Sequence, residues 1–168
     1  EDIGQVFDSI AFVRDLPFAW NAPTPGPYAS DILPVQRDLG IDLRDLRKKT
    51  GDFTDAMLEE RIFPHVEMLA NMMKQESGDR SALVFTPQVK SAQAMATALQ
   101  NLGVKAEWSS GDDENRKTKV ERYQAGELQM LCACALFCEG FDAPRTSSLG
   151  MLRPTRSRNL YAQMAGRG

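Results

Sequence analysis

The sequence predicts an α/β domain whose sheet is mostly parallel. From Ser81 onward, short apolar runs alternate with longer segments of helical periodicity. Strands and helices that alternate in this way form βαβ units with right-handed crossovers. The composition, 42% hydrophobic and 26% charged, is that of a globular protein, and 168 residues are enough for one domain or for a core domain with a small appendage.

The first 80 residues lack this regular alternation and are predicted to be a linking or accessory segment. Partial alternation over residues 6–13 favours a strand. Three prolines and a glycine within residues 21–27 favour a loop, and residues 32–43 fit a short hairpin. The fold prediction therefore rests on residues 81–168.

Two helices are predicted at the end of the linking segment. Thr54 is placed to cap the first helix, and Pro64 interrupts it. The second helix is predicted over residues 64–75, with Pro64 in its first turn. Its apolar stripe consists of Val66, Leu69 and Met73.

Seven elements are predicted in the remainder of the chain. The four strands are residues 82–85, 104–108, 128–133 and 148–152. The three helices are one that Thr86 and Pro87 cap and Gly103 ends, one that runs from residues 110–113 to Gly126, and one over residues 157–165. Acids at positions 112–114 are predicted to occupy the first turn of the middle helix, where they complement the helix dipole.

Ligands of a parallel sheet are expected beyond the carboxyl ends of the strands. Thr86 with Pro87, and Gly111, lie where predicted strands give way to helices. Two interpretations stay open for these residues: a helix cap, or a phosphate site formed by free amides at a helix N-terminus.

The C-terminal segment is rich in arginine although the chain carries a formal net charge of −3. Residues 143–168 contain no lysine and no acid, and their basic residues are Arg145, Arg153, Arg156, Arg158 and Arg167. Such a patch suits phosphate groups or an acidic partner surface. A solubilising face is the alternative interpretation.

Several classes of site have no support in the sequence. There is no G-x-x-x-x-G-K-[ST] loop, and His65 is the only histidine on which a catalytic triad could be built. Cys132, Cys134 and Cys138 lack the spacing of a zinc site and are expected to be core residues in a reducing, cytoplasmic setting. No apolar run approaches the roughly 20 residues of a membrane span.

Two short stretches near the C-terminus carry residues suited to binding a nucleotide. Gly140 lets the backbone approach a ligand closely, and the carboxylate of Asp142 can accept bonds from hydroxyls or pair with an arginine. Gln163 and Arg167 are four residues apart and are predicted to lie on one face of the last helix. Gly166, which has no side chain, leaves that face open to a ligand. A guanidinium presented in this way can bond a phosphate through two nitrogens.

Taken in order, five stretches resemble the motif series of the C-terminal RecA-like domain of superfamily-two helicases. They are residues 83–87 (LVFTP), 110–112 (SGD) with Arg116, 123–126 (YQAG), 134–144 (CALFCEGFDAP) and 161–167 (YAQMAGR). The last two look closest to the DEAD/DEAH-type group that includes repair translocases, restriction-enzyme motor subunits and phage helicases. The resemblance implies a RecA-like (P-loop NTPase-type) three-layer sandwich with a mostly parallel sheet over residues 81–168.

The resemblance also implies roles for single residues. Arg167 would reach the γ-phosphate of ATP, Gln163 would help position it, and Gly166 would lie beside them. Gly140 and Asp142 would line the ribose side of the cleft. The residues implied to contact nucleic acid are Thr86, Pro87, Gly111 and Cys134. Cys134 stands where the family usually has Thr or Asn.

The resemblance implies an ATP-dependent helicase or translocase that acts on nucleic acid, with DNA favoured over RNA. ATP and Mg²⁺ would be held mainly by a first RecA-like domain that is not in this sequence. Because the chain stops at Gly168, inside the last motif, it is expected to be a fragment that is inactive alone. The competing interpretation is a non-catalytic RecA-like module that binds nucleic acid or an acidic protein. A third interpretation, an enzyme that acts on a small molecule, is disfavoured because the sequence has no glycine-rich phosphate loop.

Overall fold

The computed structural model describes residues 41, 53–134, 144–155 and 157–165. All of them belong to one compact unit, Gly40–Gly168. The predicted strand at 6–13 and loop at 21–27 lie outside the described residues, as does the hairpin at 32–43 apart from Ile41. The division of the chain at residue 80 stays a prediction.

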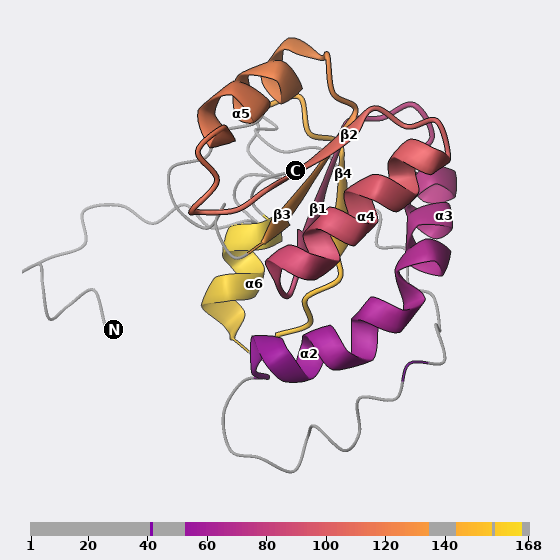
Figure 1. Ribbon diagram of the computed structural model, residues 1–168. Helices are drawn as coiled ribbons and strands as arrows, with labels where there is room; N and C mark the ends of the chain where they lie inside the picture. The colour runs from indigo at the N-terminus through magenta and orange to yellow at the C-terminus, as the bar shows by residue number, and fades with distance from the viewer. Residues whose placement is uncertain (1–40, 42–52, 135–143, 156, 166–168) are drawn as a thin grey trace, which may run out of the picture. The chain divides into compact units, whose positions relative to one another are not determined.

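Four parallel strands form the sheet, as the sequence predicts (Figure 1). They are β1 (Ala82–Thr86), β2 (Ala106–Ser109), β3 (Met130–Cys134) and β4 (Ser148–Met151), in the spatial order β2-β3-β1-β4. Ala82 pairs with Met130 on one side and with Ser148 on the other. Since all four strands point the same way, their carboxyl ends meet at one edge.

Helices cover both faces of the sheet (Figure 1). On one face, α4 (Val89–Asn101) packs on β1, β2 and β3, and α3 (Val66–Ser77) packs on α4. On the other face, α5 (Arg116–Ala125) and α6 (Arg158–Ala165) contribute Tyr123 and Met164 to the core. The result is the three-layer arrangement that the fold class requires.

Met164 ties the last helix to the sheet. It is 2% exposed and packs in one cluster with Leu83, Phe85 and Leu131. Burying a side chain of this size contributes about 1.5–3 kcal/mol relative to leaving it exposed. The position of α6 is therefore set by the apolar face of β1 and β3.

The two helices before β1 follow the prediction closely. Thr54 caps α2 (Asp55–Ile62), and its hydroxyl accepts a hydrogen bond from the amide of Met57 at 3.4 Å. Pro64 lies in a single 3₁₀ turn, η3 (Phe63–His65), that separates α2 from α3. Because proline lacks an amide donor, the turn tightens there and the chain changes direction.

The prediction that Thr86 and Pro87 cap a helix is wrong. Thr86 is the last residue of β1, and α4 begins at Val89 with Gln88 as its N-cap residue. The amide of Gln88 donates to the hydroxyl of Ser91 at 3.4 Å, and that hydroxyl donates to the carbonyl of Gln88 at 3.0 Å. These bonds secure the first turn of α4, so the hydroxyl of Thr86 is not needed there.

The predicted start of the middle helix is also wrong. α5 begins at Arg116, with Asn115 as its N-cap residue, so the acids at 112–114 precede the helix. Asp113 instead accepts a hydrogen bond from the amide of Asn115 at 3.1 Å, which forms a tight turn. The helix ends at Gly126, as predicted, with φ +85°.

Arg145 lies directly over Gly126. A Cβ atom at position 126 would be 2.1 Å from Nη1 of Arg145. The Nε of the same guanidinium donates to Oγ of Ser81 at 2.9 Å, beside the start of β1. Next to it, the buried hydroxyls of Tyr123 and Thr146 are 2.9 Å apart and share a hydrogen bond. Position 126 thus favours glycine for two reasons: its φ is positive, and the guanidinium of Arg145 occupies the space that a Cβ atom would need.

None of the helices in the described ranges has the length and apolar character of a membrane span.

Candidate functional site

The carboxyl edge of the sheet brings together three of the residues that were predicted to contact nucleic acid. Thr86 ends β1 and Cys134 ends β3, and the two are paired in register across the strands. Pro87 follows Thr86 and is buried. The thiol of Cys134 donates to the carbonyl oxygen of Pro87 at 3.6 Å, so the three residues form one contiguous unit.

The side chain of Thr86 bonds within the protein. It is 1% exposed, and its hydroxyl lies 3.3 Å from the carbonyl oxygens of both Gln88 and Ala133. These contacts fix the turn between β1 and α4. The contact to nucleic acid at this position stays a prediction.

Cys134 lies in a charged neighbourhood although it is buried. Burial raises the pKa of its thiol, and the negative charge of Asp55 raises that pKa further while Arg153 lowers it. Burial also raises the pKa of Cys132 strongly. Both thiols are therefore protonated and unreactive near neutral pH. Among the described residues, no group of three His, Cys, Asp or Glu side chains is placed to hold a metal ion.

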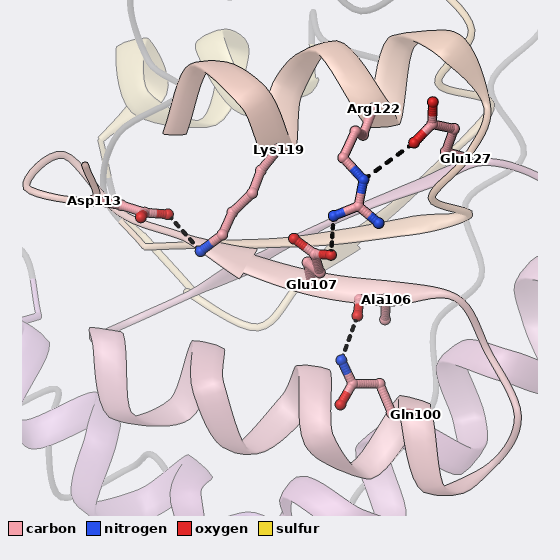
Figure 2. Close-up of polar contacts among 7 residues, drawn as sticks. All are labelled: Gln100, Ala106, Glu107, Asp113, Lys119, Arg122 and Glu127. Carbon is pink, nitrogen blue, oxygen red and sulfur yellow. Dashed lines mark hydrogen bonds and ion pairs between the residues drawn. The ribbon is translucent and has the colours of Figure 1, made fainter. Parts of the chain in front are cut away.

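Gly111 lies in an exposed turn after β2 that a charged cluster holds in place (Figure 2). The ammonium of Lys119 bonds Oδ2 of Asp113 at 2.7 Å, and the amide of Asp113 donates to the carbonyl of Ser110 at 3.3 Å. Lys119 also lies over the ring of Trp108, 4.4 Å from its centre, which adds a cation–π contact. The cluster presents the Gly111 backbone at the surface, where the prediction requires it.

A second network joins α5 to β2 and lies beside this cluster in Figure 2. The guanidinium of Arg122 donates to Glu107 on β2 and, through Nε, to Glu127 at 3.1 Å. Its hydrogen bonds to the carboxylates of Glu107 and Glu127 raise the pKa of Arg122. With Lys119, this network attaches two turns of α5 to the strand.

Replacing Asp113 with asparagine is expected to make the stability of the protein less dependent on pH. Burial acts to raise the pKa of Asp113, but bonds from Lys119 and the Asn115 amide outweigh it, and the net pKa is lowered. A lowered carboxyl pKa adds stability above the ordinary value of about 3.9, and this stability is lost as the pH falls through the lowered pKa. Urea unfolding at pH 7 should show a loss of about 1 kcal/mol in Asp113→Asn, and the two proteins should converge at low pH.

Glu121→Gln is the matched control for that measurement, because Glu121 pairs with Lys117 at 3.9 Å in an exposed position. An exposed pair of this kind contributes little. If both variants had the same pH profile, the Asp113–Lys119 pair would not stabilise the turn.

Gln163 is the one predicted nucleotide-site residue that the structure describes. It lies on α6, is exposed, and precedes the buried Met164. The hydroxyl of Ser157 accepts a hydrogen bond from the amide of Leu160 at 3.3 Å and so caps the helix. Gly140, Asp142, Gly166 and Arg167 lie outside the described residues, and their roles stay predictions.

The arginine patch is not a set of free cations. Arg145 is bonded to Ser81, and Arg153 forms an ion pair with Asp55 at 2.7 Å. Two of the five arginines of the predicted patch therefore have partners within the protein, and the binding role of the patch stays a prediction. Their partners are 64 and 98 residues away in the sequence, so no local pattern could have revealed them.

Comparison with known proteins gives a consistent result. The family model of the helicase conserved C-terminal domain matches residues 64–168. The chain is 27% identical over 134 residues to an inferred ATP-dependent helicase, IRC3, of Saccharomyces cerevisiae, a match that covers 76% of this chain and 19% of that protein. It is also 27% identical over 146 residues to a 51.5 kDa protein of a Lactococcus phage, covering 84% and 31%. The chain thus spans less than a third of either relative.

Solved structures show the same fold. A fragment of an inferred HsdR subunit of a type I restriction enzyme from Vibrio vulnificus aligns with a TM-score of 0.56 and 23% identity, covering 68% of this chain and 25% of that one. The C-terminal domain of the DEAD-box protein Dbp5 aligns with a TM-score of 0.54 and 16% identity, covering 62% of each chain. The sheet and its helices therefore have the RecA-like arrangement of helicase C-terminal domains.

Proposed function

Since this chain belongs to the helicase conserved C-terminal domain family, we propose that it is the second motor domain of an ATP-dependent helicase or translocase. The observation that carries the proposal is the extent of the family match, which includes the complete sheet and α6. A first RecA-like domain would supply the nucleotide loop and hold ATP with its Mg²⁺. This domain would supply the arginine side of the ATP cleft and part of the nucleic-acid track.

In this proposal α6 is the element that acts on ATP. Met164 packs α6 on the sheet, Gln163 lies exposed on it, and Arg167 follows four residues later in the sequence. Arg167 would bond the γ-phosphate and stabilise the charge that develops as the phosphoryl group is transferred. Gln163 would orient that contact, and Gly140 with Asp142 would border the ribose.

The turns at the carboxyl edge would follow the nucleic-acid backbone. The turn at Gly111 is exposed and secured by internal bonds, so its backbone would be a contacting surface, whereas Thr86 and Pro87 are buried and would shape this edge from within. DNA is the proposed substrate. ATP binding would close the cleft between the two domains, and hydrolysis would reopen it.

Measuring ATP hydrolysis with and without the first domain tests the proposal. The 168-residue chain alone should hydrolyse ATP no faster than buffer. A longer protein that also contains the first RecA-like domain should hydrolyse ATP, and single-stranded DNA should stimulate it more than RNA of the same length. Nucleic-acid binding without any ATP hydrolysis in the longer protein would contradict the motor and favour a non-catalytic binding module.

A further inference from the structure

An ion pair joins the beginning of α2 to the segment between β4 and α6. Oδ1 of Asp55, the first residue of α2, is 2.8 Å from Nε and 2.7 Å from Nη2 of Arg153. The two residues are 98 positions apart in the sequence. In Figure 1 the first turn of α2 lies beside the chain that leads from β4 into α6.

The geometry of this pair restrains Arg153. Two of its nitrogens contact one carboxylate oxygen, and its side chain is 18% exposed. A guanidinium held through two nitrogens and largely out of solvent has a defined orientation. Asp55 is 38% exposed, so the pair is partly screened and its main effect is geometric.

Further hydrogen bonds order the segment between β4 and α6. The amide of Leu152 donates to the carbonyl of Phe85 at 2.9 Å and so extends the pairing of β4 with β1. The amide of Ser157 donates to the hydroxyl of Thr155 at 3.0 Å, and Ser157 then caps α6. The bond of Arg153 reaches beyond the sheet and α6, to a helix that precedes the sheet.

The charges of the pair also act on Cys134, which ends β3. The charges of Asp55, Arg153 and Glu59, which lies one helical turn beyond Asp55, all shift the pKa of Cys134. Cys134 begins the 134–144 stretch that carries the predicted ribose contacts.

We propose that Asp55 and Arg153 are positioning residues for ATP hydrolysis. Their ion pair fixes the entry into α6, and α6 presents Gln163 and then Arg167 to the nucleotide. The inference rests on the proposed function. It adds Asp55, at the start of α2, to the residues that contribute to ATP hydrolysis. An arginine that must meet a phosphoryl group depends on this kind of support, because a displacement of about 1 Å can cost about a hundredfold in rate.

The test uses the protein with both motor domains and measures kcat and KM for ATP together with the Kd for single-stranded DNA. Asp55→Asn should lower kcat by about tenfold to a hundredfold while KM and Kd change little, because ATP and DNA are bound mainly by other groups. Asp55→Glu, which keeps the carboxylate, should retain more activity. The exchanged pair Asp55→Arg with Arg153→Asp should recover part of the lost kcat.

Glu60→Gln is the matched control, since Glu60 is exposed on the same helix; its kcat should equal that of the wild type. Unchanged kcat in Asp55→Asn would overturn the inference. The inference would also be overturned if Arg153→Lys bound DNA more weakly while Asp55→Asn bound DNA as the wild type does. Arg153 would then contact phosphate itself.

Hydrogen exchange of the backbone amides supplies a readout that does not need ATP hydrolysis. In Asp55→Asn, the amides of Leu160 and Tyr161, which bond to Ser157, should exchange faster than in the wild type, while those of β1 should not change. If Leu160 and Tyr161 exchanged at the same rate in Asp55→Asn and in the wild type, the ion pair would not fix the entry into α6. This result would overturn the inference even if the wild type had no ATPase activity. An inactive wild type with the predicted exchange would contradict only the proposed function.

Discussion

Replacing Arg167 with alanine in the protein that has both motor domains is expected to lower the ATP turnover number by about a thousandfold or more. The reason is electrostatic. In the proposed cleft, Arg167 supplies positive charge to the γ-phosphate at the moment when negative charge is redistributed, and little else in a phosphoryl transfer is left for this domain to do. Steady-state hydrolysis with saturating DNA measures the effect.

Two further variants make that result specific. Arg167→Lys keeps the charge but loses the planar fork, so it should recover only a small part of the rate. Lys117→Ala removes an exposed cation on α5, 90% exposed, and should leave the rate unchanged. A normal rate in Arg167→Ala would refute the role of this arginine, and the far-ultraviolet circular dichroism of that variant should match the wild type.

Substituting Gly126 with alanine is expected to lower the free energy of unfolding by about 2–3 kcal/mol. An L-residue in the left-handed region costs about 1–2 kcal/mol. The new methyl group would also displace the guanidinium of Arg145, 2.1 Å away, and break its bond to Ser81, which adds about 1 kcal/mol. Urea unfolding at pH 7 measures the sum.

Gly103 provides a matched control for this substitution. It has φ +81° and nothing within 4 Å of where a Cβ atom would lie, so Gly103→Ala should show the backbone cost alone. In an Arg145→Ala background the excess cost of Gly126→Ala over Gly103→Ala should disappear. Equal losses in the two single variants would show that Arg145 moves aside freely.

Much of this fold could be predicted because its signals are local. The central strands β1 and β3 are short, buried, mainly apolar runs, and glycines with a left-handed backbone mark the ends of α4 and α5. Thr54 as a cap and Pro64 as a break were likewise visible in the sequence. Such features depend on residues a few positions apart, which is the range over which a sequence pattern carries information.

The two errors at helix starts share one cause. Thr86 and Asp113 are both good capping residues, but each has a tertiary partner that takes its side chain. Thr86 bonds the end of β3 through the Ala133 carbonyl, and Asp113 bonds Lys119. These contacts outweigh the local preference of the two residues for capping a helix. The helices therefore begin two or more residues later than predicted, at Val89 and Arg116.

The candidate site was predictable only in part. The motif series located the carboxyl edge of the sheet and α6, and the structure brings Thr86, Pro87 and Cys134 together there. The internal partners of Arg145 and Arg153 depend on how distant segments meet, so the arginine patch looked more available than it is. Asp55 gave no functional signal at all, since an acid at the first position of a helix is ordinary.

The order of the strands has a consequence for how this domain is made. β1 lies inside the sheet, yet both of its neighbours, β3 and β4, come later in the chain. During synthesis β1 therefore leaves the ribosome before either of its neighbouring strands, so both of its edges are at first without their native partners. Unpaired apolar strands of this kind favour aggregation and pair slowly. The domain can complete its fold only after β4 has emerged, so a ribosome that pauses before Ser148 would hold a chain that needs protection by a chaperone.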